Sequence, residues 1–430
     1  MLVCEGGVFI FFFLQVMGGR GFCLRGGESS GSLKILRNHI AFFVLTFDRG
    51  IFLVCYREDR KQTSQANVRL QVVFLLSIPW PSPPSLTMMN TARLTDSAQE
   101  LMNRNILLLD GGLGTTLEDE HGVKFSSEET PLWSSHLLIS SPDTLLRVQT
   151  DFAKAGADII LTATYQASYN GMVKTPAISI WNEKQKQTAL TSAVSISKAA
   201  VDSTGRPGLV ALSLGAYGAT LIPSQEYTGA YGQCDLLSFH RSRLQAFMGD
   251  ESWKNVDIVA FETLPRLDEI KVAREVMSGH DSVKPYWISC VFPKDDKLPD
   301  GNSIEQVVKA MLEKDETVPP FAIGINCTSA HKISGLIRKF EEAADGLGLT
   351  LPRIVIYPDG AGGLIYDTAR QKWVGNGSED APWDEQVFYI VKEVVGRGRW
   401  AGLIVGGCCK TTPGYIAKLR KRLDEWEPLV

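Results

Sequence analysis

Two adjacent cysteines stand where a short apolar run meets the start of a helix near the end of the chain. Cys408 and Cys409 follow the apolar run Leu403–Val405 and two glycines. Thr412 and Pro413 come next, and they have the residue types of a helix N-cap and a first helical position. Thiolates select soft metal ions such as zinc or copper(I) over magnesium or calcium. This pair therefore indicates metal binding or thiol chemistry.

Cys327 supplies a third thiol in the same setting, directly after the apolar run 321–326. A catalytic zinc site typically has three protein ligands and one open position, which three thiols would satisfy. Neighbouring cysteines cannot both point inward from a regular strand, so Cys408 and Cys409 must lie on the turn beyond it. Gly406 and Gly407 would give the backbone that freedom. The competing interpretation is that the cysteines are small buried hydrophobic residues.

Two carboxylates also stand at the ends of apolar runs, Asp110 after the first and Glu262 after the fourth. An unpaired charge at such a place is costly, so each needs a partner. The functional interpretation is that they bind a cation, most simply the ammonium group of an amino acid. The other interpretation is a helix cap or a salt bridge. Magnesium is a poor candidate beside thiolates.

Lys410 allows a different function. Glycines after the last strands and a helix N-terminus form the phosphate site of many barrels. A lysine at that place could form a Schiff base with a carbonyl substrate. The alternative function is therefore a phosphate-binding, aldolase-like barrel in which Lys410 acts and the cysteines are incidental.

The elements that must position these residues follow from an alternation of apolar, strand-length runs with amphipathic, helix-length runs from residue 88 onward. The expected strands are 105–110, 158–164, 208–214, 256–261, 286–291, 321–326, 353–357 and 401–405. The expected helices are 142–155, 185–203, 236–249, 267–278, 303–313, 330–344, 383–395 and 413–425. Strict alternation predicts a closed (β/α)₈ TIM-type barrel, with an open doubly wound sheet as the alternative.

The carboxyl ends of barrel strands face one another across the active site, so the cysteines and carboxylates should converge there. Further polar residues expected at this rim are Thr162, Gln166, Ser213, Tyr217, Thr263, Ser289, Cys290, Asn326, Tyr357 and Asp359. No glycine fingerprint for a dinucleotide follows the first expected strand.

The composition is that of a soluble globular protein, with 44% hydrophobic and 21% charged residues among 430. A net charge of −4 argues against a general binder of nucleic acid or of anionic membranes. Eight cysteines are too sparse for a disulfide scaffold, which predicts a reducing compartment, the cytoplasm.

Residues 1–87 lack the alternation, and we expect an irregular N-terminal extension there, followed by a barrel domain at 88–430. The apolar run 8–14 is far shorter than the ~20 residues of a membrane helix, and the charge before it is wrong for a signal peptide. The apolar runs 41–45 and 51–55 show no period that pairs them. We interpret the segment as an upstream read-through of the gene, with Met88 or Met89 as the start; the alternative is a targeting or accessory segment.

Two motifs resemble the zinc motifs of the homocysteine S-methyltransferases: GINCT at 324–328 and VGGCCKTTP at 405–413. The similarity extends to LDGGLGT at 109–115, LWS at 132–134, the stretch 157–168 and FETLP at 261–265. It covers residues 105 to about 420, which is all of the regular part.

The resemblance implies a zinc-dependent (β/α)₈ enzyme that transfers a methyl group to L-homocysteine and produces methionine. The implied zinc ligands are Cys327, Cys408 and Cys409. The implied substrate-binding residues are Asp110, Gly111, Gly112, Thr164, Tyr165 and Glu262. Of these, the two carboxylates hold the amino group of homocysteine, and Thr164 and Tyr165 line the pocket.

The methyl donor implied is a sulfonium compound, S-methylmethionine or S-adenosylmethionine, which carries its own activated methyl group. Betaine and folate serve other relatives of this barrel, but the chain has no region long enough for cobalamin or folate domains. The donor cation would suit a cation–π contact with Tyr165. One departure is the stretch 357–362, YPDGAG, where family members often have YPNSGE. Donor contacts made by that loop are therefore not carried over.

Overall fold

The computed structural model describes residues 33–36, 40–47, 50–57, 96–278, 284–367, 372–375, 377 and 381–426. The chain divides into two compact units, Met1–Met89 and Asn90–Val430, and each is described by itself. None of the helices in these ranges combines the length and apolar character that crossing a bilayer requires.

The first unit contains a three-stranded antiparallel sheet in the order β1-β2-β3. Its strands are β1 (Leu33–Leu36), β2 (Ile40–Phe47) and β3 (Gly50–Arg57). The apolar runs 41–45 and 51–55 lie in β2 and β3, so the expectation of an irregular extension is wrong for these residues. Periodicity alone cannot tell whether a continuous apolar run is a buried strand or part of a buried helix, and the sequence analysis did not pair these two runs. The run 8–14 and the start at Met88 or Met89 lie outside the described residues.

The second unit is a barrel of eight parallel strands in the order β4-β13-β10-β9-β8-β7-β6-β5. The strands are β4 (Ile106–Leu108), β5 (Ile159–Leu161), β6 (Leu209–Gly215), β7 (Ile258–Leu264), β8 (Tyr286–Cys290), β9 (Ala322–Ser329), β10 (Arg353–Asp359) and β13 (Leu403–Val405). The first strand pairs with the last, as a closed barrel requires and an open doubly wound sheet does not. The (β/α)₈ prediction is confirmed.

The ring closes between β4 and β5. Leu109, just after β4, forms a parallel bridge with Ile159. The Asp158 N–H donates to the Leu108 carbonyl at 2.6 Å, and the Leu108 N–H donates to the Asp158 carboxylate at 2.9 Å. The same carboxylate accepts a hydrogen bond from Arg420 of α12 (Pro413–Asp424). The last helix therefore secures the seam between the first two barrel strands.

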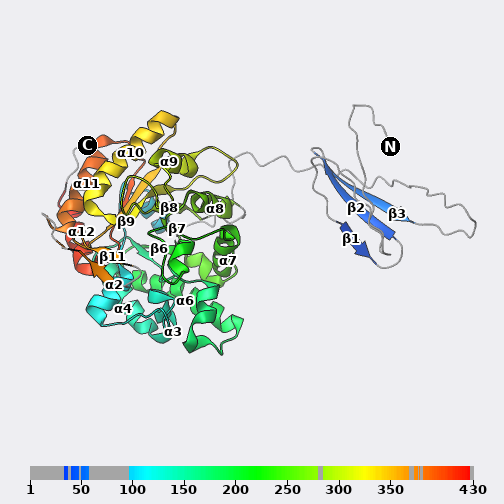
Figure 1. Ribbon diagram of the computed structural model, residues 1–430, viewed down its shortest axis with the longest axis horizontal. Helices are drawn as coiled ribbons and strands as arrows, with labels where there is room; N and C mark the ends of the chain where they lie inside the picture. Colours follow the sequence, from blue (N-terminus) through cyan, green and yellow to red (C-terminus); the bar gives the residue numbers. More distant parts are fainter. Residues whose placement is uncertain are drawn as a thin grey trace, which may run out of the picture. The chain divides into compact units, whose positions relative to one another are not determined.

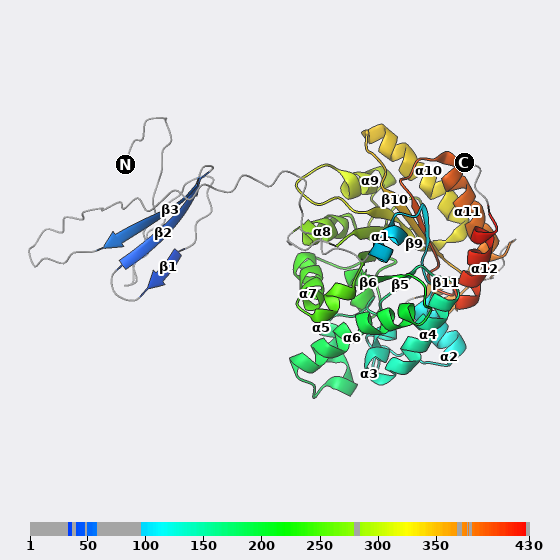
Figure 2. The ribbon, with the colours of Figure 1, turned by 180° about the vertical axis from the view of Figure 1, so that it is seen from behind.

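Helices surround the strands on the outside, as both views of the ribbon show (Figures 1 and 2). Besides α12, they are α4 (Pro142–Lys154), α6 (Glu183–Asp202), α7 (Leu236–Met248), α8 (Leu267–Ser278), α9 (Ile304–Leu312), α10 (Ala330–Leu347) and α11 (Trp383–Arg397). Each coincides in place with an expected helix. In α9 the reciprocal hydrogen bonds between Ser303 and Gln306 form a capping box that fixes the helix start.

Alternate strand residues face opposite sides, so the barrel has two apolar layers. Leu108 belongs to the layer between strands and helices, whereas Leu107 and Leu109 belong to the interior. The helix α1 (Asp96–Met102), which the sequence analysis did not expect, packs Leu101 and Met102 into that interior. The amino end of the barrel is therefore filled with apolar side chains.

Other elements that were not expected lie in the connections. They are α2 (Leu113–His121), α3 (Leu137–Ser140), α5 (Tyr169–Lys174), the 3₁₀ helices η1 (Trp133–His136), η2 (Pro176–Ile178), η3 (Tyr217–Thr220) and η4 (Glu251–Asn255), and the hairpin of β11 (Ile365–Asp367) and β12 (Lys372–Val374). Several of them supply side chains to the cavity described next.

Candidate active site

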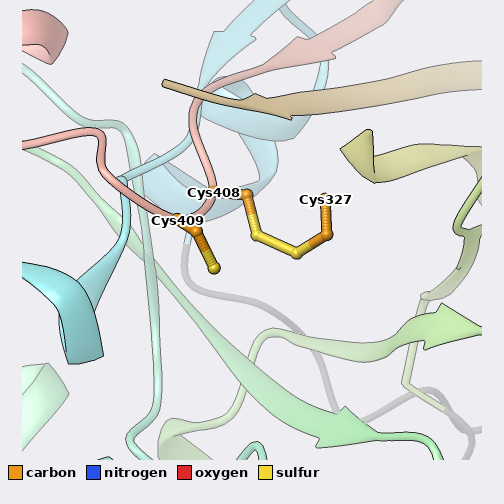
Figure 3. A group of neighbouring side chains, drawn as sticks. All are labelled: Cys327, Cys408 and Cys409. Carbon is orange, nitrogen blue, oxygen red and sulfur yellow. A yellow bond between two sulfur atoms is a disulfide. The ribbon is translucent and has the colours of Figure 1, made fainter. Parts of the chain in front are cut away.

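Three cysteine sulfurs meet at the carboxyl ends of β9 and β13 (Figure 3). Cys327 lies in β9, and Cys408 and Cys409 lie on the turn that follows β13, as expected for neighbouring cysteines. Their Sγ atoms all lie within 4.8 Å of one another. The fold thus brings together all three thiols that the sequence analysis grouped.

Two of these sulfurs are bonded to one another, because Cys327 and Cys408 form a disulfide while Cys409 is a free thiol (Figure 3). The sequence analysis expected three thiols and did not foresee this pairing. The proximity that suits a metal site also allows two of the sulfurs to bond. The disulfide is the two-electron oxidised form of the same cluster, and reduction returns three soft donors of the kind that zinc binds.

The two glycines before the cysteine pair were expected to give the backbone conformational freedom, but the structure uses their small size instead. Neither Gly406 nor Gly407 has a positive φ; in this turn the left-handed residue is Lys410, at φ 63°. A Cβ on Gly407 would lie 2.2 Å from Thr411 Oγ1, so the glycine is needed for close approach. Helix α12 begins as predicted, with Thr412 at the N-cap and proline in its first turn, although the Thr412 side chain makes no capping hydrogen bond.

Two buried carboxylates face the same cavity, Asp110 at 2% exposure and Glu262 at 4%. Asp110 Oδ2 accepts from the Leu161 N–H at 2.9 Å, while Oδ1 has no hydrogen-bond partner. Glu262 accepts a hydrogen bond from Ser213 Oγ. Within the described part of the chain, neither carboxylate caps a helix or forms an ion pair, which favours the cation-binding interpretation.

Both carboxylates hold their protons more tightly than usual. Burial raises the pKa of Asp110 well above its ordinary value, and the charge of nearby Glu262 raises it further. Burial raises the pKa of Glu262 to about 7, against hydrogen bonds from Ser213 and Tyr357 that lower it. A cation bound between them would relieve both effects, because an opposite charge favours ionised carboxylates.

The cavity has a volume of about 250 Å³ and opens at the carboxyl ends of the strands. Its lining includes these residues expected to form the site: Asp110, Gly111, Gly112, Tyr165, Glu262, Cys327, Cys408 and Cys409. Residues to which the sequence analysis gave no role also line it: Glu118, Trp133, Glu226, Tyr227, Tyr366 and Trp373. Of the altered stretch 357–362, Tyr357 alone is among the lining residues.

Thr164 is the exception among the expected residues, because it is fully buried behind the cavity wall. Its hydroxyl lies 2.7 Å from Thr162 Oγ1 and donates to the Ser213 carbonyl at 2.7 Å. The expectation that Thr164 lines the pocket is wrong. Strand β5 ends at Leu161, so the inward and outward alternation of a strand no longer applies at Thr164.

Gly111 and Gly112 let the loop after β4 pack against the cysteine loop. A Cβ on Gly112 would lie 2.4 Å from the Cys408 carbonyl oxygen. The Gly112 N–H donates to the Thr411 carbonyl at 2.8 Å. These two glycines join the first and last strand ends, beside the sulfur cluster.

Tyr165 is held from behind by Arg243, a buried residue of α7. The Arg243 guanidinium donates to the Tyr165 carbonyl at 2.9 Å and to the Gly215 carbonyl at 2.7 Å. Because arginine is a rigid fork of donors, it fixes the loops after β5 and β6 relative to one another. The role of Arg243 could not be predicted from the sequence, since the residue lies within helix α7 and not at the end of a strand.

Lys410 does not line the cavity. Its ammonium lies 2.7 Å from the carboxylate of Asp119, and 5.7 Å from the centre of the Trp373 ring. A lysine engaged in this way is not placed to attack a carbonyl in the cavity. The structure therefore contradicts the alternative in which Lys410 is the reactive group.

A family model described as homocysteine S-methyltransferase matches residues 107–423. Homocysteine S-methyltransferase 2 of Arabidopsis thaliana is 33% identical over 342 residues, which cover 74% of this chain and 92% of that protein. Selenocysteine Se-methyltransferase of Brassica oleracea var. italica is 34% identical over 340 residues, 74% of this chain and 88% of that protein.

Solved structures of the homocysteine methyltransferase MmuM from Escherichia coli share the fold. Its oxidised form matches with a TM-score of 0.58 and 26% identity, covering 76% of this chain and all of that one. Its metallated form matches with a TM-score of 0.56 and 27% identity, covering 75% of this chain and 98% of that one.

Proposed function

The chain belongs to the homocysteine S-methyltransferase family, and on that premise we propose a zinc-dependent transfer of a methyl group from a sulfonium donor to homocysteine. The enzyme is a methyltransferase that acts on homocysteine. The identity of the metal, the class of donor and the roles of individual residues are the proposal. The observation that carries it is the set of three sulfur atoms within 4.8 Å of one another, in a cavity with two buried carboxylates.

Cys327, Cys408 and Cys409, once reduced, would hold the zinc ion. Bound zinc would lower the pKa of the homocysteine thiol and keep its sulfur available as a thiolate at neutral pH. Three protein thiols suit zinc, because soft donors select it over magnesium or calcium. The need for reduced thiols is also why we place the enzyme in the cytoplasm, a reducing compartment.

Asp110 and Glu262 bind the ammonium group of homocysteine in this proposal. Asp110 Oδ1 lacks a hydrogen-bond partner and faces the cavity, so an ammonium can supply the missing donor. Ser213 and Tyr357 orient Glu262 through hydrogen bonds. Anchoring the amino acid at one end fixes where its sulfur lies, which is the positioning that a direct displacement needs.

The sulfonium donor, S-methylmethionine or S-adenosylmethionine, occupies the rest of the cavity. Aromatic rings of Trp133, Tyr165 and Tyr227 line that space. Aromatic faces attract cations, and they exclude the water that would compete for hydrogen bonds. Gly111 and Gly112 contribute by bringing the loop after β4 against the cysteine loop.

The test combines metal content with methyl transfer, on protein kept reduced. Elemental analysis should find about one zinc per chain, lost when Cys327, Cys408 and Cys409 are all changed to serine. Cys290→Ser, a buried cysteine outside the cluster, is the matched control and should keep the metal. Methionine formation from homocysteine should follow the metal, with each sulfonium donor compared. Folded, reduced protein without zinc, or a triple variant that still makes methionine, would overturn the mechanism.

A further inference from the structure

A third buried carboxylate in the cavity has no role in the proposed function. Glu226 lies on the loop between η3 and α7, is 6% exposed and lines the cavity. Its Oε2 is buried and has no hydrogen-bond partner. Leaving a buried acceptor unsatisfied is costly, and more so for a charged group, so a structural role alone does not account for it.

Glu226 lines the same cavity as the other two carboxylates but comes from a loop, whereas Asp110 and Glu262 come from the ends of β4 and β7. Asp110 and Glu262 act on one another, as the pKa of Asp110 shows. Burial raises the pKa of Tyr227 and the charge of its neighbour Glu226 raises it further, and burial raises the pKa of Glu226 itself to about 7. The cavity therefore has a third carboxylate besides the pair that the proposed function assigns to the amino group.

We propose that Glu226 recognises the positive charge of the methyl donor and makes the enzyme select a cationic sulfonium over a neutral thioether. This inference rests on the proposed function. The argument is one of position, because the methyl group must reach the acceptor sulfur at the cysteine cluster. A carboxylate with a free oxygen, in the cavity that Cys409 also lines, is placed to meet the positive sulfur of the donor.

The reaction removes the charge that Glu226 would bind. The thiol proton of homocysteine first leaves to solvent. The thiolate then forms the new bond to the methyl carbon, and the broken carbon–sulfur bond leaves its electron pair on the donor sulfur. The positive sulfonium and the negative thiolate become two neutral thioethers. Glu226 therefore attracts the donor but not the product derived from it.

This loss of charge predicts where Glu226 acts in the kinetics. An attraction present with bound donor, and weaker in the transition state, lowers the donor KM without raising kcat. The same attraction disappears after transfer, which favours release of the neutral product. Glu226 is thus a specificity-determining residue for the donor.

The loop that carries Glu226 is fixed by another buried carboxylate outside the cavity lining, that of Glu269 in α8. Glu269 accepts from the Tyr217 N–H at 2.7 Å and from the Tyr231 hydroxyl at 2.6 Å. His240 Nε2 lies 2.7 Å from Glu269 as well. Residues 217 and 231 flank Glu226, so both sides of its loop are tied to α8.

The experiment measures steady-state kinetics of Glu226→Gln with S-methylmethionine and with S-adenosylmethionine. The donor KM should rise at least about tenfold, with kcat unchanged or raised and the homocysteine KM retained. Inhibition by methionine, a neutral thioether, should not change. Glu226→Asp keeps the charge and should give an intermediate donor KM. Glu120→Gln removes an exposed charge from α2 and is the matched control.

The outcomes separate this inference from the proposed function. A wild-type enzyme inactive with every sulfonium donor contradicts the proposed function itself. An active wild type whose donor KM is unchanged in Glu226→Gln overturns the inference alone. A raised homocysteine KM would assign Glu226 to the acceptor site and also overturn it. Calorimetric titration of the wild type with S-adenosylmethionine and with S-adenosylhomocysteine, its neutral demethylated product, gives a check without a variant: equal affinities contradict the inference.

Discussion

Thr263 and Asn326 hold one another across the ends of β7 and β9. The Thr263 N–H donates to Asn326 Oδ1 at 2.8 Å, and Asn326 Nδ2 donates to Thr263 Oγ1 at 2.7 Å. Asn326 Nδ2 also lies 3.3 Å from Cys327 Sγ. Thr263, at φ 58°, and Cys327, at φ 46°, both have left-handed backbone that costs energy to maintain. The hydrogen bonds between Thr263 and Asn326 hold the backbone in this strained conformation, and Asn326 thereby fixes the position of Cys327 Sγ.

Asn326→Ala should therefore weaken both the fold and the metal site. It leaves the buried Thr263 N–H without an acceptor, so the free energy of unfolding should fall by about 1–3 kcal/mol. Loss of the groups that orient a ligand typically lowers metal affinity by about 10- to 100-fold. Chemical denaturation and competition with a zinc chelator measure the two effects. Thr263→Ser keeps the hydroxyl and serves as control; an Asn326→Ala protein with unchanged zinc affinity would refute the role.

Glu262 should make homocysteine binding depend on pH. Its pKa is about 7, so the carboxylate loses its charge below that pH while the ammonium of homocysteine stays charged. We expect kcat/KM for homocysteine to fall as pH drops from 8 to 6. In Glu262→Gln, kcat/KM for homocysteine should be lower than in the wild type at pH 8. Its remaining decrease with falling pH should occur at a lower pH than in the wild type. The reason is that Asp110 no longer has a charged neighbour raising its pKa. Identical pH profiles for the two proteins would contradict this assignment.

The same residue should lower the stability of the protein at high pH. The pKa of Glu262 is raised in the folded state, so its contribution to stability is present below pH 4.5 and is lost as pH rises through about 7. A shift of this size corresponds to about 3 kcal/mol. Glu262→Gln, which does not titrate, should therefore unfold at higher temperature than wild type at pH 8, with the difference shrinking toward pH 5. A variant less stable than wild type at pH 8 would contradict the prediction.

Tyr231→Phe should loosen the loop that carries Glu226. It removes one hydrogen bond to the buried carboxylate of Glu269, and bonds to charged groups contribute about 1.5–3 kcal/mol. We expect the donor KM to rise roughly three- to tenfold while the homocysteine KM stays constant. Tyr389→Phe changes an exposed tyrosine of α11 in the same way and should have no effect. Equal changes in both KM values would point to a general loss of structure.

Gly324→Ala should prevent β9 and β10 from pairing. A Cβ at Gly324 would lie 1.7 Å from the Val355 carbonyl oxygen, which belongs to the neighbouring strand. The clash is with backbone, so we expect a loss of about 3 kcal/mol or more in the free energy of unfolding. Gly335 is an exposed position of α10, and no atom lies within 4 Å of the Cβ that alanine would add. Gly335→Ala should therefore raise the free energy of unfolding by about 0.5–1 kcal/mol. Thermal unfolding of the pair compares them directly.

The barrel could be predicted from the sequence because its strands and helices carry a strong local period. α9 is an example, with Val307, Val308 and Met311 buried on one face. The site residues Asp110, Glu262 and the three cysteines could also be predicted, since a barrel brings all its strand ends together. That rule concerns strands, and it fails at Thr164, where the strand has already ended.

The remaining site residues could not be found in this way, because they come from connections without a period. Glu226 and Tyr227 lie on a loop. Trp373 lies in a three-residue strand of a short hairpin, which shows no alternation of apolar and polar residues from which its pairing could be predicted. The disulfide between Cys327 and Cys408 was missed for another reason. Spacing predicts that the sulfurs meet, but the oxidation state of the sulfurs is not a property of sequence.

The seam closed by Arg420 has a consequence for the order in which the protein is made. A ribosome releases β4 early, but its partner β13, the cysteine pair and α12 emerge last. Until then the sheet has two open edges, and unpaired edges invite association with other chains. The ring, the sulfur cluster and the Arg420–Asp158 ion pair are completed in the same late event. A chain stopped before β13 would therefore lack a closed barrel, and synthesis cannot yield an active enzyme before the whole barrel is complete.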